Sequence, residues 1–286
     1  MSKGEVKIGI DTRGDLFYTA RIEEAAGRPD IKALARFERA HLAGHQLLQG
    51  GDVILSVPDD KVIQKRLALS PGDGDAVLRA KFELAQTLPE DEKEFLFDVI
   101  PCGCGNRYLG LAVRREQLAA SFADYSADNF TSPEKTHYRM RAAALAKGYL
   151  AFCRPAGGDL VCVADFNDRQ VSAAFVYQGQ ILGLSHCSLE RLDLDFDEDL
   201  KRMAIEFKTV VNFALASFFR EGVTTPLSAL VIAGDGSDGR YRSVLTEYFS
   251  ISTDPPRINP GFVAEQHDTG DIPMEKYLVA LGLTVI

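Results

Sequence analysis

The stretch that decides the fold is VKIGIDTRGDLFYTARI, residues 6–22. An apolar run ends in Asp11, the turn residues Thr12-Arg13-Gly14-Asp15 follow, and a second alternating run begins at Leu16. Alternation on both sides of a glycine-containing turn predicts two strands joined by a tight hairpin. The same rhythm returns at 160–185, where an apolar run again ends in an aspartate, Asp165. The repeat predicts a duplicated α/β architecture.

The remaining segments fill in two halves around these hairpins. Residues 69–128 contain, in order, a helical, two strand-like and a helical segment, which predicts a small unit inserted in the first half. The segment Pro155-Ala156-Gly157-Gly158 predicts the boundary between a first domain, 1–157, and a second domain, 158–286. Periodic apolar residues and helix-start signals predict helices at 75–88, 115–125, 134–152, 197–219 and 273–283.

Composition limits the class of protein. With 46% apolar and 26% charged residues, the 286-residue chain is typical of a soluble globular protein. Its net charge of -9 gives no global basic field, so we expect no nucleic-acid partner. No run approaches the roughly 18 to 20 apolar residues of a membrane span, and the N-terminus lacks a signal-peptide core, so we expect a cytoplasmic protein without direct membrane insertion. Five cysteines fit a reducing compartment.

Three further sequence features could indicate a ligand site, but an ordinary structural explanation competes with each. Cys102 and Cys104 are spaced to ligate a metal, but no second pair follows, and a turn with two free thiols is favoured. His41 and His45 lie one helical turn apart without a Glu beside the first, which favours an exposed helix face. The acidic run 193–199 indicates a solvated loop, with a cation or basic-peptide contact as the alternative.

Four segments carry a resemblance to a known family. They are Ile8-Gly9-Ile10-Asp11, the strand-like run at 53–58, the helix-to-Pro segment at 81–89, and the stretch at 277–283. With the two hairpins, and with a Gly-containing turn after a late strand, they resemble the actin, sugar kinase and Hsp70 superfamily. Within it, their order and spacing resemble the PilM family of actin-like cytoplasmic proteins in type IV pilus assembly.

The resemblance implies an actin-like (ribonuclease H-like) α/β fold of two domains. The inserted unit at 69–128 would be the small α+β subdomain that the family shares with the cell-division protein FtsA. It also implies a partner, a short cytoplasmic peptide of the inner-membrane protein PilN, which would hold the chain peripheral to the inner membrane.

The resemblance also implies candidate nucleotide-binding residues, because the superfamily cradles phosphates between two hairpin turns and holds Mg²⁺ through their aspartates. The first turn supplies Asp11, Arg13 and Gly14, and the second supplies Asp165 and Asn167. Gly234 and Gly236 match the adenosine motif in part. Glu206 and Lys208 stand where ribose or base contacts occur, although solvent-facing helix charges are the commoner explanation. Metal would bind at Asp11 and Asp165 only through Mg-nucleotide.

Departures from the family pattern predict a degenerate cleft. Arg13 places a bulky cation in the first turn, and Asp168 adds a negative charge beside the expected phosphates. The connection at 187–198 is too short for the helical subdomain that forms one cleft wall, so we expect a reduced second domain. We also expect Asp165 to be partly structural, accepting backbone N–H bonds from its own turn.

The leading hypothesis is therefore a PilM-like assembly scaffold that acts by protein–protein contact, is not an enzyme, and requires no cofactor, with residual Mg-ATP binding possible. The alternative is a functional actin-like ATPase or small-molecule kinase. A third interpretation is an actin-like module of a type II secretion platform.

Overall fold

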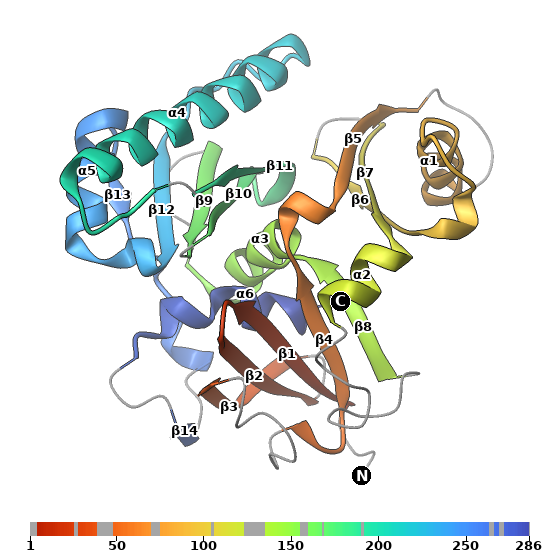
Figure 1. The fold of residues 1–286 in the computed structure, drawn as a ribbon, viewed down its shortest axis with the longest axis horizontal. Helices are drawn as coiled ribbons and strands as arrows, with labels where there is room; N and C mark the ends of the chain where they lie inside the picture. The colour runs from red at the N-terminus through yellow and green to blue at the C-terminus, as the bar shows by residue number, and fades with distance from the viewer. Residues whose placement is uncertain are drawn as a thin grey trace.

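The computed structural model describes residues 5–25, 28–38, 48–69, 75–103, 106–122, 135–154, 160–167, 169–189, 192–262, 266–268 and 272–285. These residues form two large sheets and one small sheet (Figure 1). The first sheet has the order β14-β3-β2-β1-β4-β8. Its strands are β1 (Glu5–Arg13), β2 (Leu16–Ala25), β3 (Arg28–Glu38), β4 (Asp52–Val57), β8 (Thr136–Met140) and β14 (Gln266–Asp268).

The second sheet repeats the plan of the first. Its order is β11-β10-β9-β12-β13, formed by β9 (Leu160–Phe166), β10 (Gln170–Tyr177), β11 (Gln180–Ser188), β12 (Ala229–Gly234) and β13 (Thr253–Asp254). In both sheets the first strand pairs antiparallel with the second and parallel with the fourth. The duplication predicted from the two hairpins is thus confirmed at the level of strand order.

The small inserted unit is a three-stranded sheet with two helices. The order β5-β7-β6 joins β5 (Ile63–Ala68), β6 (Phe95–Pro101) and β7 (Arg107–Arg114). Helix α1 (Ala76–Ala85) packs on this sheet, and its start is capped by Asp75, whose carboxylate accepts the N–H of Val77. Helix α2 (Arg115–Ser121) follows β7 directly. The predicted order of four elements is correct, with β5 as an additional strand before them.

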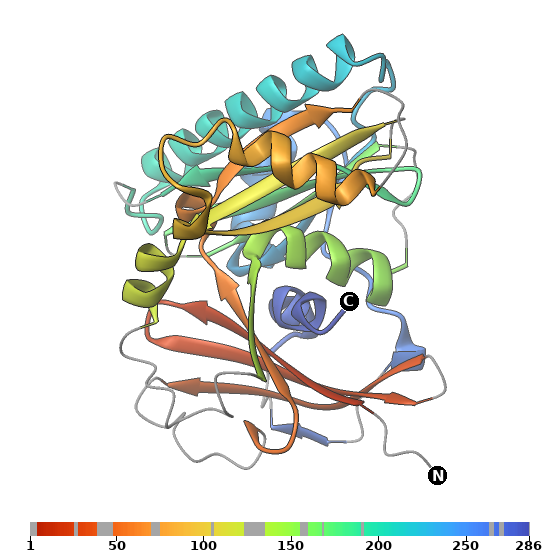
Figure 2. The ribbon, with the colours of Figure 1, turned by 90° about the vertical axis from the view of Figure 1, so that its right-hand side faces the viewer.

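Two helices form a layer between the large sheets. Figure 2 shows α3 (Arg141–Phe152) and α6 (Leu278–Leu283) in this layer. Backbones approach closely there, because a Cβ on Gly282 would lie 1.8 Å from the Ala144 carbonyl oxygen, and one on Gly148 would lie 2.3 Å from that of Leu278. Gly9 of β1 meets α6 in the same way. The glycines therefore let α6 seat against both α3 and the first sheet.

The outer side of the second sheet is covered by α4 (Asp197–Arg220) and α5 (Gly239–Phe249). With helices on both faces, β9 is buried along its whole length, which explains its almost continuous apolar sequence. Arg240 of α5 holds the acidic run before α4 by donating to the carbonyls of Leu194 and Asp195 and to the Asp197 carboxylate.

One predicted helix is wrong in its first part. Residues 136–140 of the expected helix 134–152 form β8, which pairs parallel with β4, and α3 begins at Arg141. The segment THYRM contains a β-branched residue and aromatic rings, and pairing with β4 outweighs the helical pattern of the Ala-rich stretch that follows. Residue 134, the first of this expected helix, lies outside the described residues. The same holds for residues 123–125, the last three of the expected helix 115–125.

The C-terminal part of the chain returns to the first sheet. Gln266–Asp268 pairs parallel with β3, and α6 packs on β1, although both belong to the predicted second domain. The domain boundary at 157 stays a prediction. Between β11 and α4 the chain has only residues 189–196, as the predicted short connection requires. Among the described residues, no helix has the length and apolar character needed to span a membrane.

Candidate functional site

The candidate site lies where the two predicted hairpins meet. The first hairpin turns at Gly14, whose φ of 58° suits glycine, between Arg13 and Leu16. The second turns after Phe166, and there Asn167 Oδ1 accepts the N–H groups of Arg169 and Gln170. Asn167 thus makes the turn bonds that we expected of Asp165, because its short amide side chain stands inside the turn itself. Asp168 lies outside the described residues.

Two aspartates and two arginines form a closed quartet between the hairpins. Arg13 Nε donates to Asp11 Oδ2 at 2.9 Å, and Arg13 Nη2 donates to Asp165 Oδ2 at 3.1 Å. Arg141, the first residue of α3, donates from Nη1 to Asp11 Oδ1 at 2.7 Å and from Nη2 to Asp165 Oδ1. Each guanidinium therefore bridges both carboxylates, and all four carboxylate oxygens accept a guanidinium N–H.

The quartet is withdrawn from water. Asp11 and Asp165 are fully buried, and Arg13 and Arg141 are almost so. Burial opposes the charge of Arg13, but the carboxylates of Asp165, Asp11 and Asp235 outweigh it, so the pKa of Arg13 is raised. Burial raises the pKa of Asp165, and the two guanidiniums oppose this shift. Two negative and two positive groups make the ionised quartet neutral.

This donor set does not fit Mg-nucleotide. Magnesium takes carboxylate and water oxygens, and here every oxygen of Asp11 and Asp165 already accepts a hydrogen bond from a cation. A divalent ion placed between the carboxylates would stand beside two guanidiniums and be repelled by both. Binding would require Arg13 and Arg141 to leave buried ion pairs, which is costly.

Neighbouring groups hold Arg13 in place. Its Nη2 also donates to the Lys276 carbonyl at 2.8 Å, and its guanidinium lies 4.5 Å from the centre of the Tyr18 ring. Lys276 in turn donates to Asp235 at 2.8 Å, which ties the segment before α6 to the loop after β12. Gly234 lies against this group, since a Cβ there would be 2.9 Å from Asp165 Oδ2 and 3.0 Å from Arg13 Nη1.

The other predicted nucleotide residues make contacts within the chain. A Cβ on Gly236 would collide with the Phe166 ring. On α4, Glu206 pairs with Arg202, and Lys208 Nζ donates to the Tyr248 carbonyl at 2.6 Å. The structure thus brings Asp11, Arg13, Asp165 and Gly234 together, whereas Glu206 pairs within α4 and Lys208 is bonded to α5. Their roles as nucleotide ligands stay a prediction.

Sequence reasoning missed two members of the site, Arg141 and Asp59. Asp59 is fully buried after β4, and its Oδ1 accepts the N–H of Ala142 at 2.8 Å, at the start of α3. Burial raises the pKa of Asp59 to about 7, while hydrogen bonds from Ser172 and Ala142 and the charge of Arg141 oppose the shift. A signal was present: Asp59, like Asp11 and Asp165, follows an apolar strand, and Arg141 precedes an Ala-rich run too apolar to be exposed.

A separate groove lies between the first sheet and the small unit. It has a volume of about 440 Å³ and joins the edge strand β8 to β6 and β7. Its lining is mainly apolar with a few polar groups: Val57, Val62, Leu96, Phe97, Asp98, Leu111, Ala112, Val113, Thr136, His137, Tyr138, Arg139 and Met140. Tyr138 is 40% exposed and its ring lies 5.2 Å from that of Phe122. Cys102 is a buried thiol that forms no disulfide with another described residue, whereas Cys104, His41 and His45 lie outside the described residues.

The strand order is repeated in both large sheets, and an aspartate from each hairpin lies between the two halves, an arrangement typical of the actin-like fold. Comparison with solved structures agrees with this fold. The chain is similar to the structure described as the PilM-PilN type IV pilus biogenesis complex, with 17% identity, 97% of each chain covered and a TM-score of 0.63.

A protein from Bacteroides thetaiotaomicron, described as having an actin-like ATPase fold and unknown function, is 8% identical, covers 97% of this chain and 96% of its own, and has a TM-score of 0.52. The cytoplasmic domain of EpsL from the type II secretion system of Vibrio cholerae is 12% identical over 97% and 94%, with a TM-score of 0.48. No family model and no curated protein sequence matches the chain. The chain has the actin-like fold.

Proposed function

We propose that this chain is a PilM-like cytoplasmic scaffold of type IV pilus or related secretion assembly, which acts by protein–protein contact and not by nucleotide turnover. The observation that carries the proposal is the buried quartet of Asp11, Asp165, Arg13 and Arg141. Its two arginines stand between the carboxylates that an actin-like ATPase would offer to Mg-nucleotide. The cleft is then that of a pseudo-ATPase, and the chain needs no cofactor.

The partner in this proposal is a PilN-like cytoplasmic peptide of an inner-membrane protein. The complex to which the fold is similar contains PilM and PilN, which makes such a peptide the natural candidate. The groove beside β8 offers a place for it. The edge strand β8 presents backbone N–H and C=O groups to a further strand, and Tyr138, Leu96 and Phe97 offer apolar contacts for alternate side chains. Through this peptide the chain would lie peripheral to the inner membrane.

The sequence also points to the small unit and its junction with the first domain as the partner site, because the helix 75–88 and the strand 95–100 carry apolar residues beside acidic ones. In the structure, Leu96, Phe97 and Asp98 of β6 line the groove. Helix α1 packs on the small sheet but supplies none of the lining residues. The proposed site therefore uses β6 and β8, with the α1 surface as a comparison surface for the experiment.

The test is a calorimetric titration of the full chain with a peptide that spans the cytoplasmic segment of a PilN-type protein, with and without Mg-ATP. We expect the peptide to bind, and Mg-ATP neither to bind nor to change the peptide affinity. Tyr138→Ala should weaken binding at least about fivefold, because a well-placed aromatic contact contributes about 1 kcal/mol or more. The matched control is Phe82→Ala on α1, which removes a ring that is 62% exposed outside the groove and should leave binding unchanged.

Two outcomes would overturn the proposal. If Mg-ATP bound and were hydrolysed, and both effects disappeared with Asp11→Ala and Asp165→Ala, the chain would be an ATPase or kinase of the same fold. If the peptide failed to bind, or bound equally well to Tyr138→Ala and more weakly to Phe82→Ala, the partner or its site would be wrong.

A further inference from the structure

The outward face of α4 is unusually apolar for an exposed helix. Leu200, Ala204, Phe207 and Val211 face the second sheet and are buried. On the other side Ile205 is 51% exposed, Phe213 73% and Phe219 66%. With Phe196, which is 64% exposed just before the helix, residues 196–219 hold four of the nine exposed large apolar side chains among the described residues. Apolar side chains gathered along one exposed helix indicate a candidate interaction surface.

This face is also shaped for close approach. Ile205, Thr209, Asn212 and Ala216 follow one another at spacings of four, three and four residues, so they form a line along the helix. All four are exposed, and the three after Ile205 are small or short. Phe213 and Phe219 stand on opposite sides of this line. Figures 1 and 2 show α4 as the outermost layer of the molecule, with none of the drawn elements beyond it.

We propose that α4 is the contact between two copies of this chain, which pair antiparallel about a two-fold axis through Thr209. Residues equidistant from Thr209 then face each other. Ile205 meets the partner's Phe213, and Glu198 meets the partner's Arg220, each contact being made twice. Glu198 and Arg220 make no ion pair with another described residue, so both charges are available. Antiparallel pairing also places opposite ends of the helix dipoles together.

A second copy fits this face better than an unrelated protein, because the face is self-complementary. A two-fold contact requires the same surface to supply both sides, and here one helix carries its apolar centre and a matched pair of opposite charges at its ends. Helix α4 has 24 residues, and such a helix is roughly 36 Å long. Short residues along its centre allow the interaxial distance of about 8 to 10 Å that packed helices have. This proposal is independent of the peptide groove.

The experiment is sedimentation velocity of the full chain over a range of concentration. We expect a monomer–dimer equilibrium that Phe213→Asp shifts at least tenfold toward monomer. Glu198→Arg and Arg220→Glu should each weaken the dimer, and the double exchange should restore it. Because all three side chains are exposed, peptide binding should stay unchanged, and so should the melting temperature measured at a concentration where the wild type is monomeric. These two readouts separate this proposal from the proposed function.

Oxidative cross-linking provides the geometric check. Thr209→Cys should give a disulfide-linked dimer, because the axis brings the two copies of residue 209 together. Ser243→Cys on α5, also exposed, is the matched control and should not cross-link above wild type. A chain that stays monomeric up to about 100 µM would overturn the proposal. So would polymers dissolved by Phe82→Asp but not by Phe213→Asp, since these would place the contact on the exposed Leu78 and Phe82 of α1.

Discussion

At the residue scale, Asp59 makes the charge of the buried centre depend on pH. Asp11, Asp59 and Asp165 are fully buried, and among the described residues the guanidiniums of Arg13 and Arg141 are the cations that act on them. If all five groups were ionised, the centre would carry one uncompensated negative charge. Burial raises the pKa of Asp59 to about 7, so its carboxyl keeps a proton below neutrality.

This shift predicts a stability that falls as the pH rises. The folded-state pKa of Asp59 lies above the unfolded value of about 3.9, so between pH 4 and pH 7 the folded protein holds a proton that the unfolded chain has released. The contribution is complete below pH 4 and lost above pH 7. Asp59→Asn keeps an oxygen for the Ala142 N–H but does not titrate. Relative to wild type, the variant should gain on the order of 4 kcal/mol in free energy of unfolding between pH 4 and pH 8.

Urea denaturation of both proteins at several pH values measures that difference. Taking the variant minus the wild type cancels the carboxylates and histidines that the two proteins share. A constant difference from pH 4 to pH 8 would mean that Asp59 is ionised throughout, and that the charge of the centre is balanced in another way.

Residues of the site were predictable to the extent that they stand in local turns. Asp11, Arg13 and Asp165 could be placed because each hairpin carries its own signal over a few residues. The partnership between them could not, because Arg141 is 130 residues from Asp11 and reaches it only when α3 lies between the sheets. Local reasoning likewise predicts that Asp165 accepts the N–H groups of its own turn. In the structure Asn167 accepts them, because it stands inside the turn.

At the element scale, strands and isolated helices were predictable from periodicity, whereas the junction at 140 was not. An Ala-rich stretch preceded by Arg and Tyr has helical spacing throughout, and only pairing with β4 distinguishes β8 from the first turns of a longer α3. The contact between α3 and α6 could not be predicted from the sequence either. The contact depends on Gly148 and Gly282, which lie inside helices and away from any turn signal. A local sequence pattern does not indicate that the backbone of another helix packs against them.

That contact predicts a strong effect of one added methyl group. In Gly282→Ala the new Cβ would lie 1.8 Å from the Ala144 carbonyl oxygen and 2.6 Å from the Gly148 nitrogen, both backbone atoms that cannot rotate away. We expect a loss of about 3 kcal/mol or more in free energy of unfolding, because α6 must move off α3. The control is Gly239→Ala at the start of α5, where a Cβ meets nothing within 4 Å and should cost less than about 0.5 kcal/mol.

Thermal or urea unfolding of the two glycine variants gives the comparison. Equal stabilities would show that α6 is not seated on α3 at this distance. A Gly282→Ala variant that is destabilised but keeps a cooperative transition is the expected form of the result.

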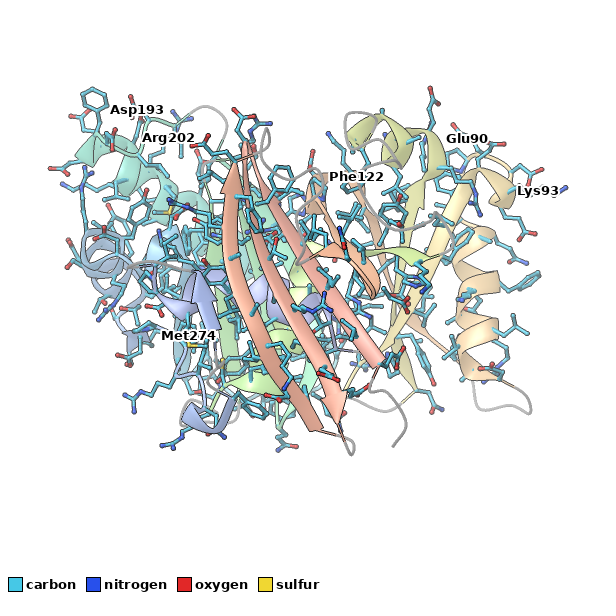
Figure 3. All side chains as sticks on the ribbon, turned by 90° about the horizontal axis from the view of Figure 1, so that it is seen from below. Glu90, Lys93, Phe122, Asp193, Arg202 and Met274 are labelled. Carbon is cyan, nitrogen blue, oxygen red and sulfur yellow. The ribbon has the colours of Figure 1, made fainter. Side chains whose placement is uncertain are left out.

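At the scale of the whole molecule, the quartet joins the two halves. Arg13 and Asp11 come from the first sheet, Asp165 comes from the second, and Arg141 begins a helix between them. Glu221 at the end of α4 adds a second tie, accepting from Arg66 of β5 at 2.7 Å and pairing with Arg107 of β7. Figure 3 shows Asp193, which precedes α4, and Arg202 of α4 at the side of the molecule opposite Glu90 and Lys93 of the small unit.

The quartet predicts how the free energies of unfolding of three variants should rank. Arg141→Met leaves one oxygen of Asp11 and one of Asp165 without a partner in the interior and should cost about 3–5 kcal/mol. Adding Asp165→Asn should recover part of the loss, because it removes an uncompensated buried charge. The control is Arg202→Met, whose pair with Glu206 is exposed, and which should cost less than about 1 kcal/mol.

A double-mutant cycle in urea measures these differences. If Arg141→Met were no more destabilising than Arg202→Met, or if Asp165→Asn added its full cost to that of Arg141→Met, the quartet would not connect the halves as described.

The position of α6 has a consequence for how the chain folds as it is made. Leu278–Leu283 is buried along its whole length and shares the layer between the two sheets with α3, yet it follows every other described element in the sequence. During synthesis from the N-terminus, the apolar faces of both sheets therefore emerge from the ribosome before the segment that covers them. We therefore expect the cooperative fold to form only after this segment has been translated, and the exposed layer to be a target for chaperones until then.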